Sequence, residues 1–435
     1  MASTDSARRF RWALAGIVLA GFALRLTWIL VTREHQTFAG DAGFYHLGAN
    51  LLVDGKGFVS PYHPSRQAAD HPPLYMLWLA IPSLVGLRSQ LAHMVWSAVL
   101  GCASIALVGA TGRQIGGART GLIAAGIAAL YPNMWVPDGS LMAETVAIFT
   151  TALALYWAYR YWHEPSWGKL AIVGVAAGAG ALSRSELVLI VPLMVVPLAV
   201  LVPGPSRADR WRGIGAGTAA AVFVMAPWLV YNMTRFKEPE LLSTQFGLTL
   251  SAANCDQVWN GQFVSYFFIG CSQRIEKTLP PGLDESQQDA RHRRVAIDYV
   301  KDHLDDVPRI ALARVGAVLG LYEPEYQITL DGTFEGRGMR WARTGMYSFY
   351  ALALLSVWGA IALRRRHTVP VFPLLVPPVM VLFTVITIYA STRFRASAEV
   401  SLCLLAAIAL DGGITFVAGR RSGSATAPEV QGTAI

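Results

Sequence analysis

The sequence predicts an all-α protein that crosses a membrane about ten times, and three observations lead to this fold class. Hydrophobic residues make up 54% of the 435 residues and charged residues only 15%, whereas soluble domains carry about 25% charge. The apolar residues gather in runs of about 20, the length that a helix needs to cross the roughly 30 Å hydrocarbon core. Arginines cluster at the ends of these runs, as topology signals of membrane proteins do.

Ten apolar runs are long enough to be spans. They are residues 12–32, 90–112, 119–137, 140–160, 168–183, 187–204, 213–232, 343–363, 368–390 and 397–418. The first run is too long for a signal peptide and has no small-residue cleavage site. Because the apolar segment 72–86 is short and opens with two prolines, we expect an interfacial or re-entrant helix there.

The basic clusters support this choice of spans. With a cytoplasmic N-terminus, ten spans place the clusters Arg207–Arg212 and Arg364–Arg366 in the cytoplasm. A further span at 72–86 would move both clusters outside, against the positive-inside rule. We therefore expect a multi-pass plasma-membrane protein, of a bacterium, with both termini cytoplasmic and its active site extracytoplasmic.

This topology divides the chain into four parts. They are an N-terminal transmembrane module (1–232) with a catalytic first outer loop (33–89), an extracytoplasmic loop region (233–342), the C-terminal transmembrane helices (343–418) and a disordered cytoplasmic tail (419–435). Long ordered loops are often functional. The loop region carries an amphipathic stretch, about Asp289 to Tyr322, which we expect on the membrane surface.

The net charge of +8 does not indicate a nucleic-acid partner, because the basic residues sit at the ends of apolar runs. No nucleotide, zinc-protease or serine-hydrolase motif is present, and no His/Cys cluster has metal-ligand spacing. We expect no metal and no cofactor. Cys255 and Cys271 lie close together in the second outer loop. They form a structural disulfide if that loop is extracytoplasmic and are free thiols if it is cytoplasmic.

Asp41, in the motif GDAGFYHLGANLLVDGKGF, follows the first span and should lie close to the outer surface. Partial desolvation at this depth raises the pKa of a carboxylate and suits it to accept a proton. The alternative is that Asp41 caps the short helix that the apolar spacing predicts after it.

Four further residues are costly near a membrane unless they are paired or functional. Glu144 lies just inside the outer end of its span, and Arg25 lies deeper, in the first span. Arg184 is expected at the outer face, where it either serves the site or simply pairs with Glu186. His71 precedes two prolines and is either a phosphate ligand or an ordinary surface histidine.

Arg393 and Arg395, at the outer end of the penultimate span, oppose the positive-inside trend and suggest a bound anion. The topology brings distant residues to one face: Asp41, His71, Glu144, Arg184 and Arg393. That face combines acids that could accept a proton with bases that could hold a phosphate. The simplest reaction that needs both is group transfer from a lipid phosphate.

The chain resembles the GT-C superfamily of membrane glycosyltransferases, in particular the branch with protein O-mannosyltransferases and the lipid A aminoarabinose transferase. The resemblance rests on the Asp41 motif and on HPPLYMLWLA, SLMAETVAIF, LSRSELVLIVPL, APWLVYN and STRFRASAEVSLCLLAA, spread over residues 12–410. It implies an inverting transferase with a polyprenyl-phosphate sugar donor and Asp41 as the general base.

The resemblance also implies basic residues around the donor phosphate, and we expect Tyr45 and Lys56 of the same motif beside them. Glu144 is expected as a second acid of the site. This chain departs from the lipid A branch in having His71 where that branch has Lys. It departs from the protein mannosyltransferases in having Asp41-Ala42 where they have two adjacent acids.

The expected acceptor is a cell-envelope glycan, glycolipid or protein. The rival function is a transporter or flippase for lipid-linked sugars or lipids, which would place its polar groups near the bilayer midplane. A second rival is an inactive envelope scaffold.

Overall fold

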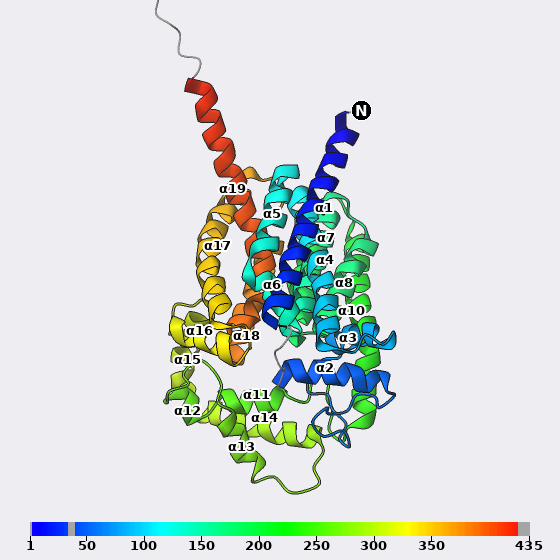
Figure 1. Ribbon diagram of the computed structural model, residues 1–435, viewed down its shortest axis with the longest axis vertical. Helices are drawn as coiled ribbons and strands as arrows, with labels where there is room; N and C mark the ends of the chain where they lie inside the picture. The colour runs from blue at the N-terminus through cyan, green and yellow to red at the C-terminus, as the bar shows by residue number, and fades with distance from the viewer. Residues whose placement is uncertain (1, 34–39, 425–435) are drawn as a thin grey trace, which may run out of the picture.

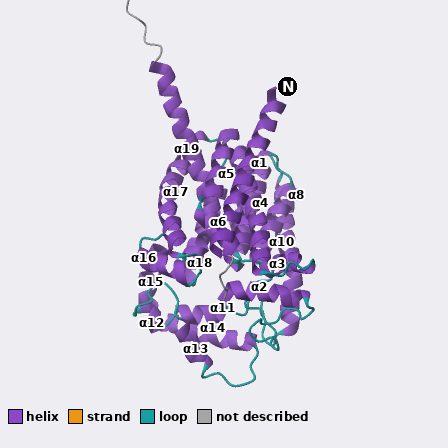
Figure 2. Cartoon of the chain, viewed as in Figure 1, coloured by secondary structure: helices purple, strands orange, loops and turns teal. Residues whose placement is uncertain are grey.

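The computed structural model describes residues 2–33 and 40–424. Within this part of the chain the structure is helical and has no strand (Figure 2). A single isolated bridge joins Val59 and Gln67. The predicted all-α membrane fold class is therefore confirmed.

Long helices stand side by side and form the bundle (Figure 1). They are α1 (Ala2–Trp28, continued by the π-helix η1, Ile29–Arg33), α4 (Gln90–Gly116), α7 (Glu144–His163), α8 (Trp167–Ala181), α10 (Arg207–Arg235), α17 (Met339–Arg366), α18 (Phe372–Thr387) and α19 (Ala396–Ser424). Among the described residues, five helices are long and apolar enough to cross a membrane by themselves: Asp5–Arg33, Gln90–Gly116, Arg207–Arg235, Met339–Arg366 and Thr392–Ala418.

Two predicted spans are not single helices, and prolines explain both differences. The run 119–137 divides into α5 (Ala118–Leu130) and α6 (Pro132–Ser140), with Tyr131 extended between them. Proline lacks a backbone N–H and disfavours a helical conformation in the residue before it. The run 187–204 is likewise a series of short turns, the 3-10 helix η2 (Ser185–Leu189), the π-helix η3 (Val191–Val195) and α9 (Val196–Leu201), with prolines early in the last two.

Short helices gather at one end of the bundle (Figure 1). There α2 (Gly40–Val53) and α3 (Leu74–Leu84) lie across the helix ends, and α3, with 11 residues, is too short to span. The region 233–342 forms α11 (Phe246–Ala253), α12 (Asp256–Trp259), α13 (Ile269–Glu276), α14 (Glu285–Asp302), the 3-10 helix η4 (Leu304–Asp306), α15 (Val307–Val318) and α16 (Pro324–Thr333). The start of α1 and the end of α19 lie at the opposite end.

The expected tail, 419–435, is helical as far as Ser424, and its remaining residues lie outside the described part of the chain. The amphipathic stretch expected on the membrane surface comprises most of α14 and all of η4 and α15. The apolar half, α15, packs against α18 of the bundle.

Small residues allow α8 and α10 to pack very closely. A Cβ atom on Gly174 would collide with the carbonyl oxygen of Gly217, and one on Gly178 would crowd the carbonyl oxygen of Ala221. These glycines therefore bring two backbones into direct contact, as small residues do between membrane helices. We name this contact the glycine seam.

Arg25 has the partner that its depth requires. Its Nε atom lies 2.7 Å from Oδ2 of Asp138 in α6, and both side chains are fully buried. Thr145 donates a hydrogen bond to the other carboxylate oxygen at 2.9 Å, and the guanidinium also donates to the carbonyl oxygens of Gly21 and Met134. This satisfied ion pair joins α1 to α6 inside the bundle.

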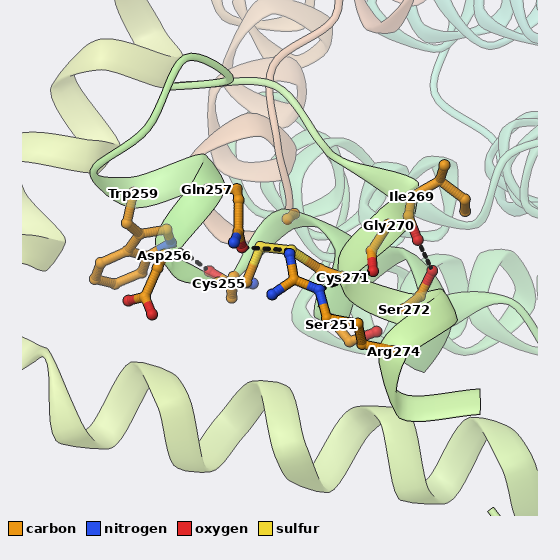
Figure 3. Close-up of a disulfide and its surroundings, with 12 residues drawn as sticks. Ser251, Cys255, Asp256, Gln257, Trp259, Ile269, Gly270, Cys271, Ser272 and Arg274 are labelled. Atoms are coloured by element: carbon orange, nitrogen blue, oxygen red, sulfur yellow. Dashed lines mark hydrogen bonds between the residues drawn. A yellow bond between two sulfur atoms is a disulfide. The ribbon is translucent and has the colours of Figure 1, made fainter. Parts of the chain in front are cut away.

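Cys255 and Cys271 form a disulfide that links the start of α12 to α13 (Figure 3). With a sequence separation of 16 residues, closing this loop stabilises the folded state by about 3 kcal/mol in the chain-entropy model. Replacing both cysteines with serine should therefore loosen α11–α13 and leave the bundle intact. Hydrogen exchange should rise in 246–276 and not in α4 or α19. Exchange rising equally in the bundle would show that the disulfide stabilises the whole protein.

Candidate active site

Five of the predicted residues meet at the end of the bundle that carries α2 and α3. Asp41 comes from α2, Glu144 from the first turn of α7, and Arg393 from the 3-10 helix η5 (Thr392–Arg395) before α19. His71 and Arg184 come from the segments that precede α3 and η2. Ion pairs connect all five side chains.

The carboxylate of Asp41 lies between the side chains of Arg393 and His71. Its Oδ2 atom is 2.9 Å from a terminal nitrogen of Arg393, and its Oδ1 atom is 3.3 Å from Nε2 of His71. Although Asp41 belongs to the first turn of α2, both of its oxygens thus contact side chains of other segments.

The predicted pKa shift of Asp41 is wrong in direction. Burial does raise its pKa, as the sequence suggested, but 31% of the side chain stays exposed. The charges of His71 and Arg393, and the hydrogen bonds that both donate, hold the pKa well below its ordinary value. Asp41 is therefore ionised at neutral pH, and its contacts with His71 and Arg393 weaken it as a base.

Arg393 also contacts two further carboxylates. Its other terminal nitrogen lies 2.7 Å from Glu335, in the loop before α17, and its Nε atom lies 3.5 Å from Glu144. Burial raises the pKa of Glu335, although Arg393 opposes the shift. Sequence reasoning missed Glu335, because the long 233–342 region has no pattern that places one acid in space. The two glycines of Glu335-Gly336-Arg337-Gly338 are a local signal of an unusual loop at this position.

Arg184 connects two acids. Its guanidinium lies 2.8 Å from Glu144 and 2.7 Å from Glu186, and it packs over the ring of Phe394 at 4.6 Å. The simple Arg184–Glu186 pair that the sequence left open is therefore present, and the same arginine also fixes Glu144 beside Arg393.

Tyr45 is buried beside the cluster, with its ring centroid 5.1 Å from that of His71. Burial and the charges of Asp41 and Glu144 raise its pKa, so its phenol stays protonated and can donate a hydrogen bond.

Two predicted phosphate ligands lie elsewhere. Lys56 is exposed after α2, and its side chain makes no contact with the cluster among the described residues. Arg395 is buried beside Glu399, at 3.3 Å, and packs over the ring of Phe349. It lies two residues beyond Arg393, and residues two apart on a helical turn do not share a face. Among the described residues neither side chain joins the ion pairs of Asp41 and Arg393, and their assignment to the phosphate site stays a prediction.

The family model described as dolichyl-phosphate-mannose-protein mannosyltransferase matches residues 70–231. This segment contains His71, Glu144 and Arg184. No curated protein sequence matches the chain.

The fold is similar to that of the oligosaccharyltransferase AglB from Archaeoglobus fulgidus. The comparison with the structure of that enzyme in complex with an inhibitory peptide and a dolichol-phosphate gives a TM-score of 0.52. The two chains are 16% identical over 97% of this chain and 53% of the other. A structure of the Archaeoglobus fulgidus oligosaccharyltransferase with zinc and sulfate gives 0.56 at 14% identity over 94% and 50%. ArnT from Cupriavidus metallidurans bound to undecaprenyl phosphate gives 0.41 at 16% identity over 91% and 78%.

The chain spans about half the length of the oligosaccharyltransferase chains. The predicted resemblance is nevertheless confirmed by two independent observations, the family-model match and a fold shared over almost the whole chain. The chain is therefore similar to the GT-C membrane glycosyltransferases in residues 70–231 and in its fold.

Proposed function

We propose that the protein transfers a monosaccharide from a polyprenyl-phosphate carrier to a hydroxyl group of a cell-envelope acceptor. The observation that carries this proposal is the position of Asp41, a partly exposed carboxylate held directly beside Arg393 and His71. Such a site pairs a proton acceptor with cations that can stabilise a departing phosphate. The acceptor is a glycan, glycolipid or protein outside the plasma membrane.

In this reaction the carboxylate of Asp41 takes the proton of the acceptor hydroxyl. The hydroxyl oxygen bonds to the anomeric carbon while the bond from that carbon to the phosphate oxygen breaks. The released lipid phosphate keeps the bonding electrons, and Arg393 and His71 stabilise its charge. A single displacement of this kind inverts the anomeric centre.

The comparisons support a lipid-linked donor. The description of the matching family model names a dolichyl-phosphate sugar, and the AglB structure holds a dolichol-phosphate and a peptide. The long 233–342 region would cover the acceptor, with the Cys255–Cys271 disulfide as a brace. Mannose and arabinose are the sugars that we would offer first.

A reconstitution experiment tests the proposal. Purified protein in liposomes is given polyprenyl-phosphate mannose or arabinose with an envelope extract, and labelled sugar is followed in the carrier and acceptor fractions. We expect protein-dependent transfer and an inverted anomeric configuration by NMR. Movement of the carrier between leaflets without transfer would show a flippase instead, and inertness in both assays would favour a scaffold.

A further inference from the structure

Glu335 sits in a short loop that crosses the site, residues 334–338, which we name the strap. Gly336 and Gly338 both have positive φ, at 64° and 77°, a conformation that glycine adopts without strain. Backbone hydrogen bonds to Leu330 and Asp331 of α16 and a hydrogen bond from Arg33 to the carbonyl oxygen of Gly336 hold the strap in place. Its position is thus defined, but it lies outside any helix.

The single positive charge of Arg393 faces three carboxylates: Asp41, Glu144 and Glu335. One terminal nitrogen is occupied by Glu335 and the other by Asp41. Arginine binds a phosphate best through two parallel N–H bonds from one edge of the guanidinium. Each edge shares a terminal nitrogen with one of these carboxylates, so a phosphate that binds Arg393 in this way must compete with a carboxylate for its charge.

Glu335 is the carboxylate best able to leave. Glu144 is 2% exposed, begins α7 and is also held by Arg184 at 2.8 Å. Asp41 belongs to α2 and is fixed by His71 as well. The only ion pair of the Glu335 side chain within the described residues is that with Arg393, and the strap around it contains two glycines.

We propose that Glu335 is a resident anion that occupies the phosphate position on Arg393 before the lipid donor binds and is displaced by the phosphate of that donor. This inference rests on the proposed function and adds a regulation of the same site. The strap moves away from Arg393 as the phosphate binds, so a neutral lipid cannot open it. Glu335 thereby keeps the site closed to ligands without a phosphate.

The neighbours of Glu335 determine how pH affects this competition. It faces Arg393 of η5, Asp41 of α2 and Glu144 of α7. The phenols of Tyr266, between α12 and α13, and Tyr389, between α18 and η5, are also close. Burial raises the pKa of Glu335, so it takes up a proton before the other acids do. A protonated Glu335 no longer competes as an anion, so its opposition to phosphate binding should weaken as pH falls.

The test is the affinity of the full-length protein in nanodiscs for undecaprenyl phosphate, compared between the wild type, Glu335→Gln and a control, Glu325→Gln. Glu325 lies nearby in α16 but is exposed and pairs with Arg343 at the surface. We expect Glu335→Gln to bind about tenfold more tightly at pH 8, since removing a like charge from a buried site favours an anion. The control should match the wild type.

The difference in affinity between wild type and Glu335→Gln should shrink as the pH falls from 8 toward the raised pKa of Glu335. The phosphate ionises in the same way for both proteins. The ratio of their affinities for undecaprenyl phosphate therefore reports on Glu335 alone. Undecaprenol without a phosphate should show no gain in the variant. Hydrogen exchange in 334–338 should rise in wild type saturated with undecaprenyl phosphate and stay constant with undecaprenol.

Equal or weaker binding by Glu335→Gln at pH 8 would overturn the inference and make Glu335 a residue that positions Arg393. Sugar transfer by the wild type in the same preparation reports separately on the proposed function. If the wild type transfers sugar but Glu335→Gln binds undecaprenyl phosphate no more tightly, only the inference about Glu335 fails. If the wild type neither binds undecaprenyl phosphate nor transfers sugar, the proposed function and the inference about Glu335 both fail.

Discussion

Replacing Asp41 with asparagine is expected to lower kcat for sugar transfer by about 10²–10⁴-fold, the range that one general base contributes. The amide can still accept a hydrogen bond from Arg393, but it cannot take the proton of the acceptor hydroxyl. Donor affinity should change much less than kcat, because Arg393 and His71 remain. Initial rates and donor affinity in the same liposomes measure both quantities.

Asp54→Asn is the matched control, since Asp54 follows the same helix but pairs with Arg88 at the surface. It should transfer sugar at the wild-type rate. Full activity in Asp41→Asn would refute Asp41 as the base. A parallel loss of donor affinity and kcat would instead assign Asp41 to binding.

The pH dependence of the reaction follows from the same contacts. Because the two cations depress the pKa of Asp41 in the free enzyme, its ionisation should not limit kcat/KM between about pH 5 and pH 8, well above the usual Asp pKa of about 3.9. A bound phosphate shares the charge of Arg393 and so raises the pKa of Asp41. The acidic limb of kcat should therefore lie at higher pH than that of kcat/KM.

Breaking the Arg25–Asp138 pair is expected to have the largest effect on stability. Arg25→Met leaves an uncompensated carboxylate that is 1% exposed, and removal of one partner of a buried ion pair costs about 3–5 kcal/mol. Unfolding of the purified protein by a denaturing detergent measures the loss.

The double variant Arg25→Met/Asp138→Asn removes both charges and keeps the side-chain volumes similar. It should recover most of the lost stability, because no unpaired charge remains. Side chains larger than these would not fit beside Gly101, since even a Cβ atom on Gly101 would collide with the carboxylate of Asp138. If the double variant is as unstable as Arg25→Met, packing of the arginine and not its charge stabilises the bundle.

The sequence predicted the bundle well because span length and arginine clusters are both local signals. It failed at Tyr131–Pro132 and in 187–204, where proline interrupts a run that is apolar throughout. Hydropathy measures the affinity of a segment for lipid and does not report whether its backbone hydrogen bonds continue.

The candidate site was predicted in part. Residues at the ends of spans, such as Glu144 and Arg184, could be placed because topology alone fixes their depth. Glu335 could not, since its contact with Arg393 depends on the path of a long loop. The pKa of Asp41 was misjudged for the same reason. Its partner Arg393 lies 352 positions away in the sequence. The depth of Asp41 predicts the burial that raises its pKa, but not the contacts with distant residues that lower the pKa by more.

The glycine seam restricts where the tail of the proposed polyprenyl carrier can lie. A long isoprenoid needs a gap between helices, and two backbones in direct contact leave none between α8 and α10. These helices also cannot slide past each other without forcing Cα atoms against carbonyl oxygens. A carrier tail must therefore enter along another side of the bundle. A covalent cross-link that locks α8 to α10 should leave carrier entry unimpeded, so this pair can serve as a fixed reference against which motions of the other helices are measured.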